Sequence, residues 1–124
     1  MHNIWYVHLV DLGGRRKPQP GSVNNAWRHS AFRGYADYMQ TEAFSKAFEE
    51  LKIIGGAQRT AFMCSEAVWW SCHRSLIADR LKIEGWKVWH IMEVNKAVEH
   101  PYTSAAHIAD GQLRYDQPEL FKDG

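Results

Sequence analysis

Residues 59–91, RTAFMCSEAVWWSCHRSLIADRLKIEGWKVWHI, hold the pattern that decides the fold. The apolar run TAFMC, at 60–64, predicts a short buried strand. Ser71 is placed to cap a helix that ends at Gly85, and WKVWHI, at 86–91, predicts another strand. A strand, a helix and a strand in this order predict a right-handed crossover between parallel strands. We therefore expect an α/β fold.

The chain before this pattern contains a further expected strand and two expected helices. IWYVHLV, at 4–10, is rich in β-branched and aromatic residues and predicts a buried strand. Apolar residues at helical spacing predict one helix over 31–39 and a second that follows Thr41, its N-cap, and ends at 55–56. Prolines, glycine and asparagines between 15 and 25 predict a loop.

The segment after these elements has a less regular pattern. HPYTSAAHIADG, at 100–111, predicts one or two helical turns, and QLRY, at 112–115, predicts an edge strand. Together the elements predict one domain over 1–124, with a small, mostly parallel sheet of about three to four strands flanked by helices. Because a parallel sheet needs both faces covered, we expect a homodimer to complete the core.

Composition and charge exclude several classes of protein. The chain has 15 lysines and arginines against 14 aspartates and glutamates, a net charge of +1, which is too small for strong nucleic-acid binding. The start, MHNIWYVHLVDLGG, lacks the pattern of a secretory signal, and no apolar run reaches the length of a membrane span. With only two cysteines, we expect a cytoplasmic protein with reduced thiols and no membrane partner.

Polar residues gather where the expected strands end and the expected helix begins. Open parallel sheets bind ligands beyond the carboxyl ends of their strands, and helix N-termini attract anions. We therefore expect a site for a negatively charged ligand at this edge of the sheet. Its central side chains are Cys64, Glu66, Cys72, His73, Arg74 and His90.

Three of these side chains are expected to be catalytic. Cys72 is the expected nucleophile, since a helix N-terminus and a neighbouring cation favour a thiolate. Glu66 and His73 are the expected proton donors or acceptors. Each also has a structural interpretation. Cys72 could be a small buried residue, His73 could face the sheet, and Glu66 could pair with Arg74 and hold the loop.

The remaining candidates are expected to bind the ligand. Arg74 suits a phosphate or a carboxylate because its guanidinium donates two parallel hydrogen bonds. The others are Ser71 at the helix start, Cys64 and His90 at strand ends, Trp70 as an aromatic wall, and Asp11 after the first strand. His90 and Cys64 also have a packing interpretation.

A metal site is the alternative use of the same residues. Two cysteines and two histidines could bind zinc, but Cys64 and Cys72 are eight positions apart and not in the usual two-to-four-residue knuckle. A disulfide between them is geometrically possible but unfavourable in the cytoplasm. We expect no metal and no other cofactor.

Several motifs in order resemble a known family. They are HLVDLGGRR, NNAW, FRGYADYM, MCSEAVWWSCHRSLIADRL, GWKVWHI and EHPYTSAAHIADGQLRY. Over about Tyr6 to Tyr115, the chain resembles the prokaryotic family called domain of unknown function 488. The resemblance implies an α/β fold and a cytoplasmic protein but no activity. It also implies that this chain lacks the usual N-terminal strand, helix and strand, which strengthens the expectation of a dimer.

Two functional hypotheses follow. The first is an enzyme that acts on a phosphate- or carboxylate-bearing small molecule or nucleotide through the Cys/His/Arg/Glu cluster. The second is a non-catalytic module that binds a nucleotide or a modified base, with stacking on Trp70 and other tryptophans. A third interpretation makes the chain a regulatory, dimerising partner of a longer homologue.

Overall fold

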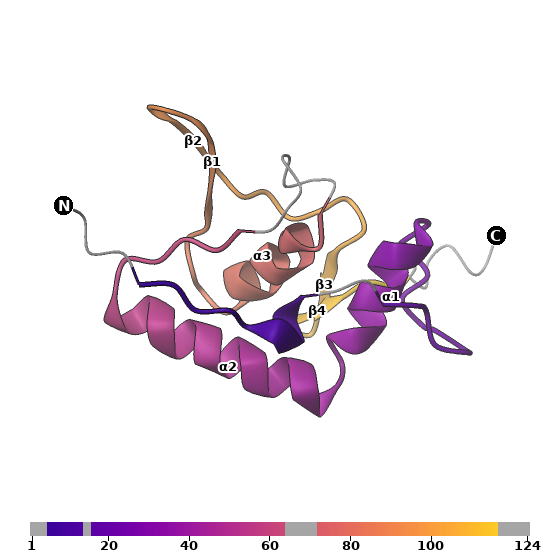
Figure 1. Cartoon of the computed structure of the whole chain (residues 1–124). Helices are drawn as coiled ribbons and strands as arrows, with labels where there is room; N and C mark the ends of the chain where they lie inside the picture. Colours follow the sequence, from indigo (N-terminus) through magenta and orange to yellow (C-terminus); the bar gives the residue numbers. More distant parts are fainter. Residues whose placement is uncertain (1–4, 14–15, 64–71, 117–124) are drawn as a thin grey trace.

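The structure is a computed structural model that describes residues 5–13, 16–63 and 72–116. Within these ranges the helices are η1 (Val10–Leu12, a 3-10 helix), α1 (Ser30–Tyr38), α2 (Glu42–Ala57) and α3 (Arg74–Ile83). The strands are β1 (Trp89–Glu93), β2 (Lys96–Glu99), β3 (His107–Ala109) and β4 (Gln112–Arg114). Helices and strands are therefore mixed, as the sequence predicts (Figure 1).

The helix over α2 begins where the sequence predicts. Thr41 is its N-cap, and the Thr41 hydroxyl accepts a hydrogen bond from the Phe44 backbone N–H at 3.3 Å. The buried positions of α2 are Phe44, Ala47, Phe48 and Leu51, which is the predicted apolar stripe. Fully burying a phenylalanine stabilises the fold by about 1.5–3 kcal/mol.

The helix α3 has a buried face that runs almost its whole length. Leu76 and Ala78 are 0% exposed, and Asp79 is buried beside them. The N-cap of α3 is His73 and not the predicted Ser71, which lies outside the described residues. At the other end, Gly85 has a φ of +94°, which favours glycine and stops the helix as predicted.

The predicted parallel sheet is wrong for the part of the chain that the structure describes. The described strands form two separate antiparallel pairs, β1 with β2 and β3 with β4. Residues 5–9 of the first predicted strand and 60–63 of the second are not strands, and Trp5 is 82% exposed. Of the three strands predicted over 4–10, 60–64 and 86–91, the described residues form a strand only at the third, which overlaps β1.

Local turns explain why antiparallel pairs form. Two residues connect β1 and β2, and the second, Asn95, has a φ of 65°. Asp110 and Gly111 connect β3 and β4 with φ values of 52° and 75°, which suits a two-residue hairpin turn. Closing such a short loop costs less entropy than a crossover between distant strands. The helical turns predicted for 100–111 are therefore wrong, whereas the edge strand at 112–115 is confirmed as β4.

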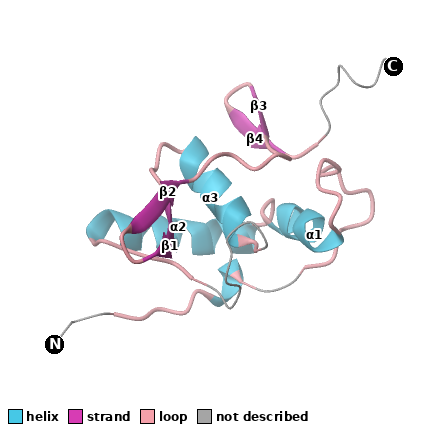
Figure 2. Cartoon of the chain, turned by 90° about the horizontal axis from the view of Figure 1, so that it is seen from above, coloured by secondary structure: helices cyan, strands magenta, loops and turns pink. Residues whose placement is uncertain are grey.

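The core joins all three α-helices. Tyr35 of α1, Phe44 of α2 and Leu76 of α3 belong to one buried apolar cluster. In both views α3 lies between the two hairpins, which are apart from one another (Figures 1 and 2). No helix in the described ranges is long and apolar enough to cross a membrane.

The loop before α1 is held against that helix. The Asp37 carboxylate accepts hydrogen bonds from Gln19 N, Ser22 Oγ and Asn24 Nδ2, each at 2.7 Å. A Cβ atom on Gly34 would lie 2.0 Å from the backbone oxygen of Arg16, so this contact requires glycine. The predicted loop is therefore confirmed, and it is packed closely on α1.

Candidate active site

Cys72 and His73 form a sulfur–imidazole pair at the start of α3. The Cys72 Sγ lies 3.6 Å from His73 Nδ1, and the Arg74 backbone N–H donates to the same sulfur at 3.5 Å. The Ser75 hydroxyl donates to the Cys72 carbonyl at 2.9 Å and fixes the cysteine backbone. Cys72 is only 3% exposed, so solvent reaches this sulfur poorly.

The His73 imidazole packs on the Tyr35 ring, with ring centroids 4.9 Å apart. Burial, followed by the positive charge of Arg74, lowers the pKa of His73 below its usual value, so the ring is neutral at neutral pH. Tyr35 in turn donates its hydroxyl to the Leu12 carbonyl at 2.5 Å. Burial raises the pKa of Tyr35, which keeps this hydroxyl protonated as a donor.

Asp11 contributes to this region through its backbone. The Tyr38 hydroxyl donates to the Asp11 carbonyl at 2.6 Å. The Asp11 side chain is exposed and makes no hydrogen bond to the residues that the structure describes. The structure therefore does not bring the Asp11 carboxylate to the Cys72–His73 pair.

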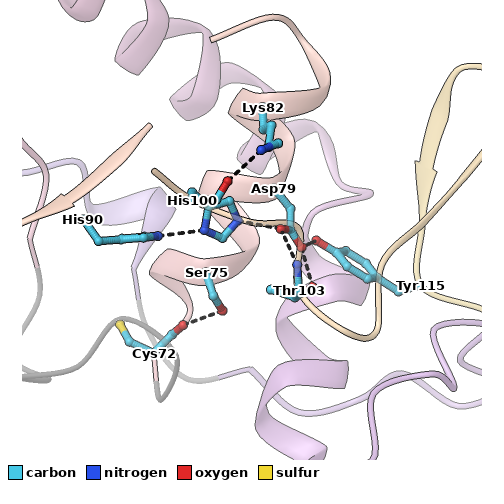
Figure 3. Close-up of polar contacts among 8 residues, drawn as sticks. All are labelled: Cys72, Ser75, Asp79, Lys82, His90, His100, Thr103 and Tyr115. Carbon is cyan, nitrogen blue, oxygen red and sulfur yellow. Dashed lines mark hydrogen bonds and ion pairs between the residues drawn. The ribbon is translucent and has the colours of Figure 1, made fainter. Parts of the chain in front are cut away.

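A second polar group runs from α3 to β1 through two buried histidines (Figure 3). The Asp79 Oδ1 lies 2.7 Å from His100 Nε2, and His100 Nδ1 lies 2.7 Å from His90 Nε2. Asp79 and His100 are 0% and 1% exposed, and His90 is 9% exposed. We call Asp79, His100 and His90 the histidine relay.

The hydrogen bonds determine which nitrogens carry protons. An ionised carboxylate only accepts, so His100 Nε2 must donate to Asp79. In a neutral His100 ring, Nδ1 then accepts, and its donor is His90 Nε2. The lone pair of a neutral His90 is therefore on Nδ1, the nitrogen that points away from His100.

Asp79 is also bonded to the chain that follows β2. Thr103 donates to this carboxylate twice, from its backbone N–H at 3.0 Å and from its hydroxyl at 2.6 Å. The Tyr115 hydroxyl donates to Oδ2 at 2.8 Å. Burial, followed by the charge of Asp79, raises the pKa of Tyr115 and keeps the phenol protonated. With His100, four donors satisfy the carboxylate.

The pKa of His90, at the outer end of the relay, depends partly on a charge at the start of α3. Burial first, then His100 and Arg74, lower the pKa of His90 to about 4. His90 is therefore neutral at neutral pH, and its ring lies within electrostatic range of the Arg74 guanidinium. The charge of Arg74 thus acts on the His90 ring.

Some expected site residues are not described. Cys64, Glu66, Trp70 and Ser71 lie outside the described residues, so the disulfide and the zinc set that include Cys64 stay untested. Among the residues that are described, no group of three or more histidine, cysteine, aspartate or glutamate side chains could hold a metal ion.

Of the three relay residues, only His90 was expected at the site from the sequence, and Asp79 and His100 were not. Asp79 lies four positions after Ser75 and three after Leu76, which places a carboxylate on the buried stripe of α3. A buried carboxylate requires donors, and this was the available signal. The donors His100 and Tyr115 lie 21 and 36 positions further along the chain, so no local pattern identifies them.

Comparison with known proteins adds a family to this geometry. The family model for domain of unknown function DUF488 matches residues 1–81, which is more than half of the chain. The chain belongs to the DUF488 family. The DUF488 match includes the sulfur–imidazole pair, Arg74 and Asp79, whereas His90 and His100 follow it. No curated protein and no solved structure matches the chain.

Proposed function

We propose that this DUF488 protein is an enzyme that transfers protons during a reaction of a small molecule bearing a phosphate or a carboxylate. His90 is the proton acceptor or donor, and Arg74 binds the anionic group. The observation that supports the proposal most directly is the histidine relay, whose outer ring lies within electrostatic range of Arg74.

The relay gives His90 a route for a proton that an isolated buried histidine lacks. When His90 takes up a proton at Nδ1, it transfers its Nε2 proton to His100 Nδ1, 2.7 Å away. The positive charge then resides on His100, whose Nε2 is 2.7 Å from the Asp79 carboxylate. This ion pair stabilises the charged state, because the attraction between opposite charges is strong in a buried setting.

Cys72 is the nucleophile of this proposal. The neutral His73 ring, 3.6 Å from the sulfur, accepts the thiol proton, and the Arg74 backbone N–H stabilises the thiolate. The predicted contributions of Glu66 as a proton donor or acceptor, and of Cys64, Ser71 and Trp70 as ligand contacts, remain part of the proposal.

His90→Gln tests the proton transfer. The glutamine amide can still donate to His100 Nδ1 but cannot accept a proton as a base. With p-nitrophenyl phosphate and p-nitrophenyl acetate as probes, we expect kcat to fall about a hundredfold or more. His8→Gln is the matched control, since His8 is exposed, and it should keep full activity.

Inorganic phosphate tests the anion site separately. In an NMR titration of the full chain, we expect the backbone amides of Arg74 and Ser75 to shift and to reach saturation. Unchanged turnover in His90→Gln, or phosphate that leaves these amides unshifted, would contradict the proposal.

A non-catalytic module that binds a nucleotide or a modified base is the second candidate. Two observations favour it: Cys72 is 3% exposed, and the Asp79 carboxylate is satisfied by structural donors. Cys72→Ser separates the candidates. If the protein is an enzyme, the variant loses turnover and keeps phosphate binding, whereas a binding module has no turnover to lose. Alkylation of the wild-type chain is the second measurement: in a binding module, Cys72 reacts slowly with iodoacetamide at every pH tested.

The expected homodimer also remains a proposal, and so does the cytoplasmic location. Large apolar side chains are exposed at several places, among them the start of the chain (Trp5 and Tyr6, each 82% exposed) and the first hairpin (Ile91, 75%, and Val94, 88%). Exposed apolar surface of this kind is typical of interfaces. Light scattering tests the proposal, and a monomer at high concentration would contradict it.

A further inference from the structure

A polar pocket lies near the C-terminal end of α3, away from the Cys72–His73 pair at its start. Its volume is about 590 Å³, and its walls come from the loop before α1, from α1, from the last turn of α3 and from β3–β4. Pockets of this size accommodate small organic ligands. The residues that matter for its chemistry are Asn24, Gln40, Arg80, Gln112, Arg114 and Tyr115.

Hydrogen bonds hold two of the pocket walls in place, the loop before α1 and the segment at the end of β4. Asn24 is fixed by the Asp37 carboxylate at 2.7 Å, and Tyr115 is fixed by Asp79 at 2.8 Å. The Ala26 backbone N–H donates to the Tyr115 carbonyl at 2.8 Å and joins these two walls. The pocket is therefore built before any ligand arrives, which lowers the entropy lost on binding.

An ion-pair cluster lies on the same segment as Tyr115, and its charges balance one another. Asp116 binds Arg114 at 2.5 Å and His107 at 2.6 Å. Burial alone would raise the pKa of Asp116, but the hydrogen bonds from His107 and Arg114 outweigh it. The pKa is therefore lowered, and the carboxylate stays charged. Neither Asp116 nor Arg114 therefore needs a ligand to balance its charge.

Arg80 is different from the other charged residues of the pocket. The acidic residue next to it in the lining, Glu84, is already bonded to Lys52 at 2.6 Å. Among the residues that the structure describes, the Arg80 side chain has no ion pair, and its buried Nε has no hydrogen-bond partner. A guanidinium is always charged and can only donate, so the Arg80 Nε–H can bond an acceptor on a ligand.

The lining also carries amides with unused hydrogen-bonding capacity. The side chains of Gln40 and Gln112 make no hydrogen bond to the described part of the chain, and each amide can both donate and accept. Met39, Ile83 and Leu113 supply the apolar part of the wall. Among the described residues, the pocket thus offers one cation without an ion pair, Arg80, together with neutral polar groups and apolar surface.

We infer that this pocket binds a small organic molecule whose carboxylate or phosphate group pairs with Arg80 and whose polar body contacts Gln40 and Gln112. This site is separate from the one at the start of α3, and it does not rest on the function proposed there. Because Tyr115 lines the pocket and also bonds Asp79, an occupant contacts a residue that supports the histidine relay.

An NMR titration of the full chain tests the inference with three probes: benzoate, phenyl phosphate and benzamide. Benzamide has the shape of benzoate without its charge. We expect benzoate or phenyl phosphate to shift the backbone amides of Arg80 and of 111–115 until saturation. Benzamide should bind at least about tenfold more weakly.

Two variants identify the group that binds the anion. Arg80→Gln should weaken the binding of the charged probe about tenfold or more, since it removes the charged donor. Arg28→Gln removes the same charge from an exposed position outside the pocket lining and should leave binding unchanged. Circular dichroism confirms that both variants fold.

Three outcomes would overturn the inference. They are the absence of saturable shifts with either charged probe, equal binding of benzamide and benzoate, and unchanged binding in Arg80→Gln. Shifts confined to Arg74 and Ser75 would likewise overturn it, and they would instead support the anion site of the proposed function.

Discussion

The Asp79 carboxylate and the His100 imidazole share a 2.7 Å hydrogen bond while both side chains are 0% exposed. This contact joins the buried face of α3 to the chain after β2. The same carboxylate also accepts from Thr103 and Tyr115, so one residue ties α3 to three positions in the last quarter of the chain. Asp79 is therefore both the inner end of the histidine relay and a structural centre.

Asp79→Ala should destabilise the protein strongly. The substitution leaves the His100 Nε2–H, the Thr103 N–H and two hydroxyl groups without their acceptor in a buried region. We expect the free energy of unfolding to fall by about 3 kcal/mol or more, measured by urea denaturation. Asp11→Ala is the control. Because the Asp11 side chain is exposed, its removal should change the free energy of unfolding by less than about 0.5 kcal/mol. Equal effects of the two variants would contradict the structural role of Asp79.

Stability should decrease between about pH 6.5 and pH 4, partly because of His90. Its pKa is about 4 in the folded protein and 6.5 as a model value, so the unfolded chain takes up a proton first as the pH falls. His73, whose pKa is also lowered, acts in the same direction. Urea denaturation of wild type at several pH values should show this loss.

His90→Gln should make the pH dependence in that window shallower. The exposed His8 gives the matched control, and His8→Gln should keep the wild-type slope. The comparison of slopes, and not of absolute stabilities, isolates His90, because His90→Gln also alters the contact with His100. A slope identical to wild type in His90→Gln would show that His90 titrates normally in the folded protein.

Gly34 and Gly56 should respond in opposite ways to alanine. A Cβ on Gly34 would lie 2.0 Å from the Arg16 backbone oxygen, so the loop would have to move away from α1. We expect Gly34→Ala to cost about 2 kcal/mol or more. Gly56, in α2, has no atom within 4 Å of the added Cβ, so Gly56→Ala should stabilise by up to about 1 kcal/mol. Thermal denaturation compares them, and a stable Gly34→Ala would show that the loop is not packed on α1.

The sequence was informative where structure depends on neighbouring residues. The N-cap at Thr41, the apolar stripe of α2 and the stop at Gly85 depend on residues a few positions apart, and they were predicted correctly. The prediction of a parallel sheet is wrong, because strand pairing depends on competition between local and distant partners. The Asp110–Gly111 pair, with φ values of 52° and 75°, is the local hairpin signal that favours the antiparallel pair of β3 and β4.

The candidate site shows the same division. Cys72, His73 and Arg74 are adjacent in the chain, and their spacing alone was enough to single them out. The histidine relay depends on contacts between residues that are 10 and 21 positions apart. A sequence pattern shows that Asp79 is buried, but only the fold shows which donors reach it.

The most direct test of the central claim is the protonation of the two relay histidines, measured by long-range proton–nitrogen NMR of the full chain at pH 7. We predict that the His90 ring is neutral, that both rings carry a proton on Nε2, and that Asp79→Asn changes the His100 signals first and those of His90 through them. A proton on His100 Nδ1 with none on Nε2, or His100 signals that Asp79→Asn leaves unchanged, would show that Asp79, His100 and His90 do not form a relay.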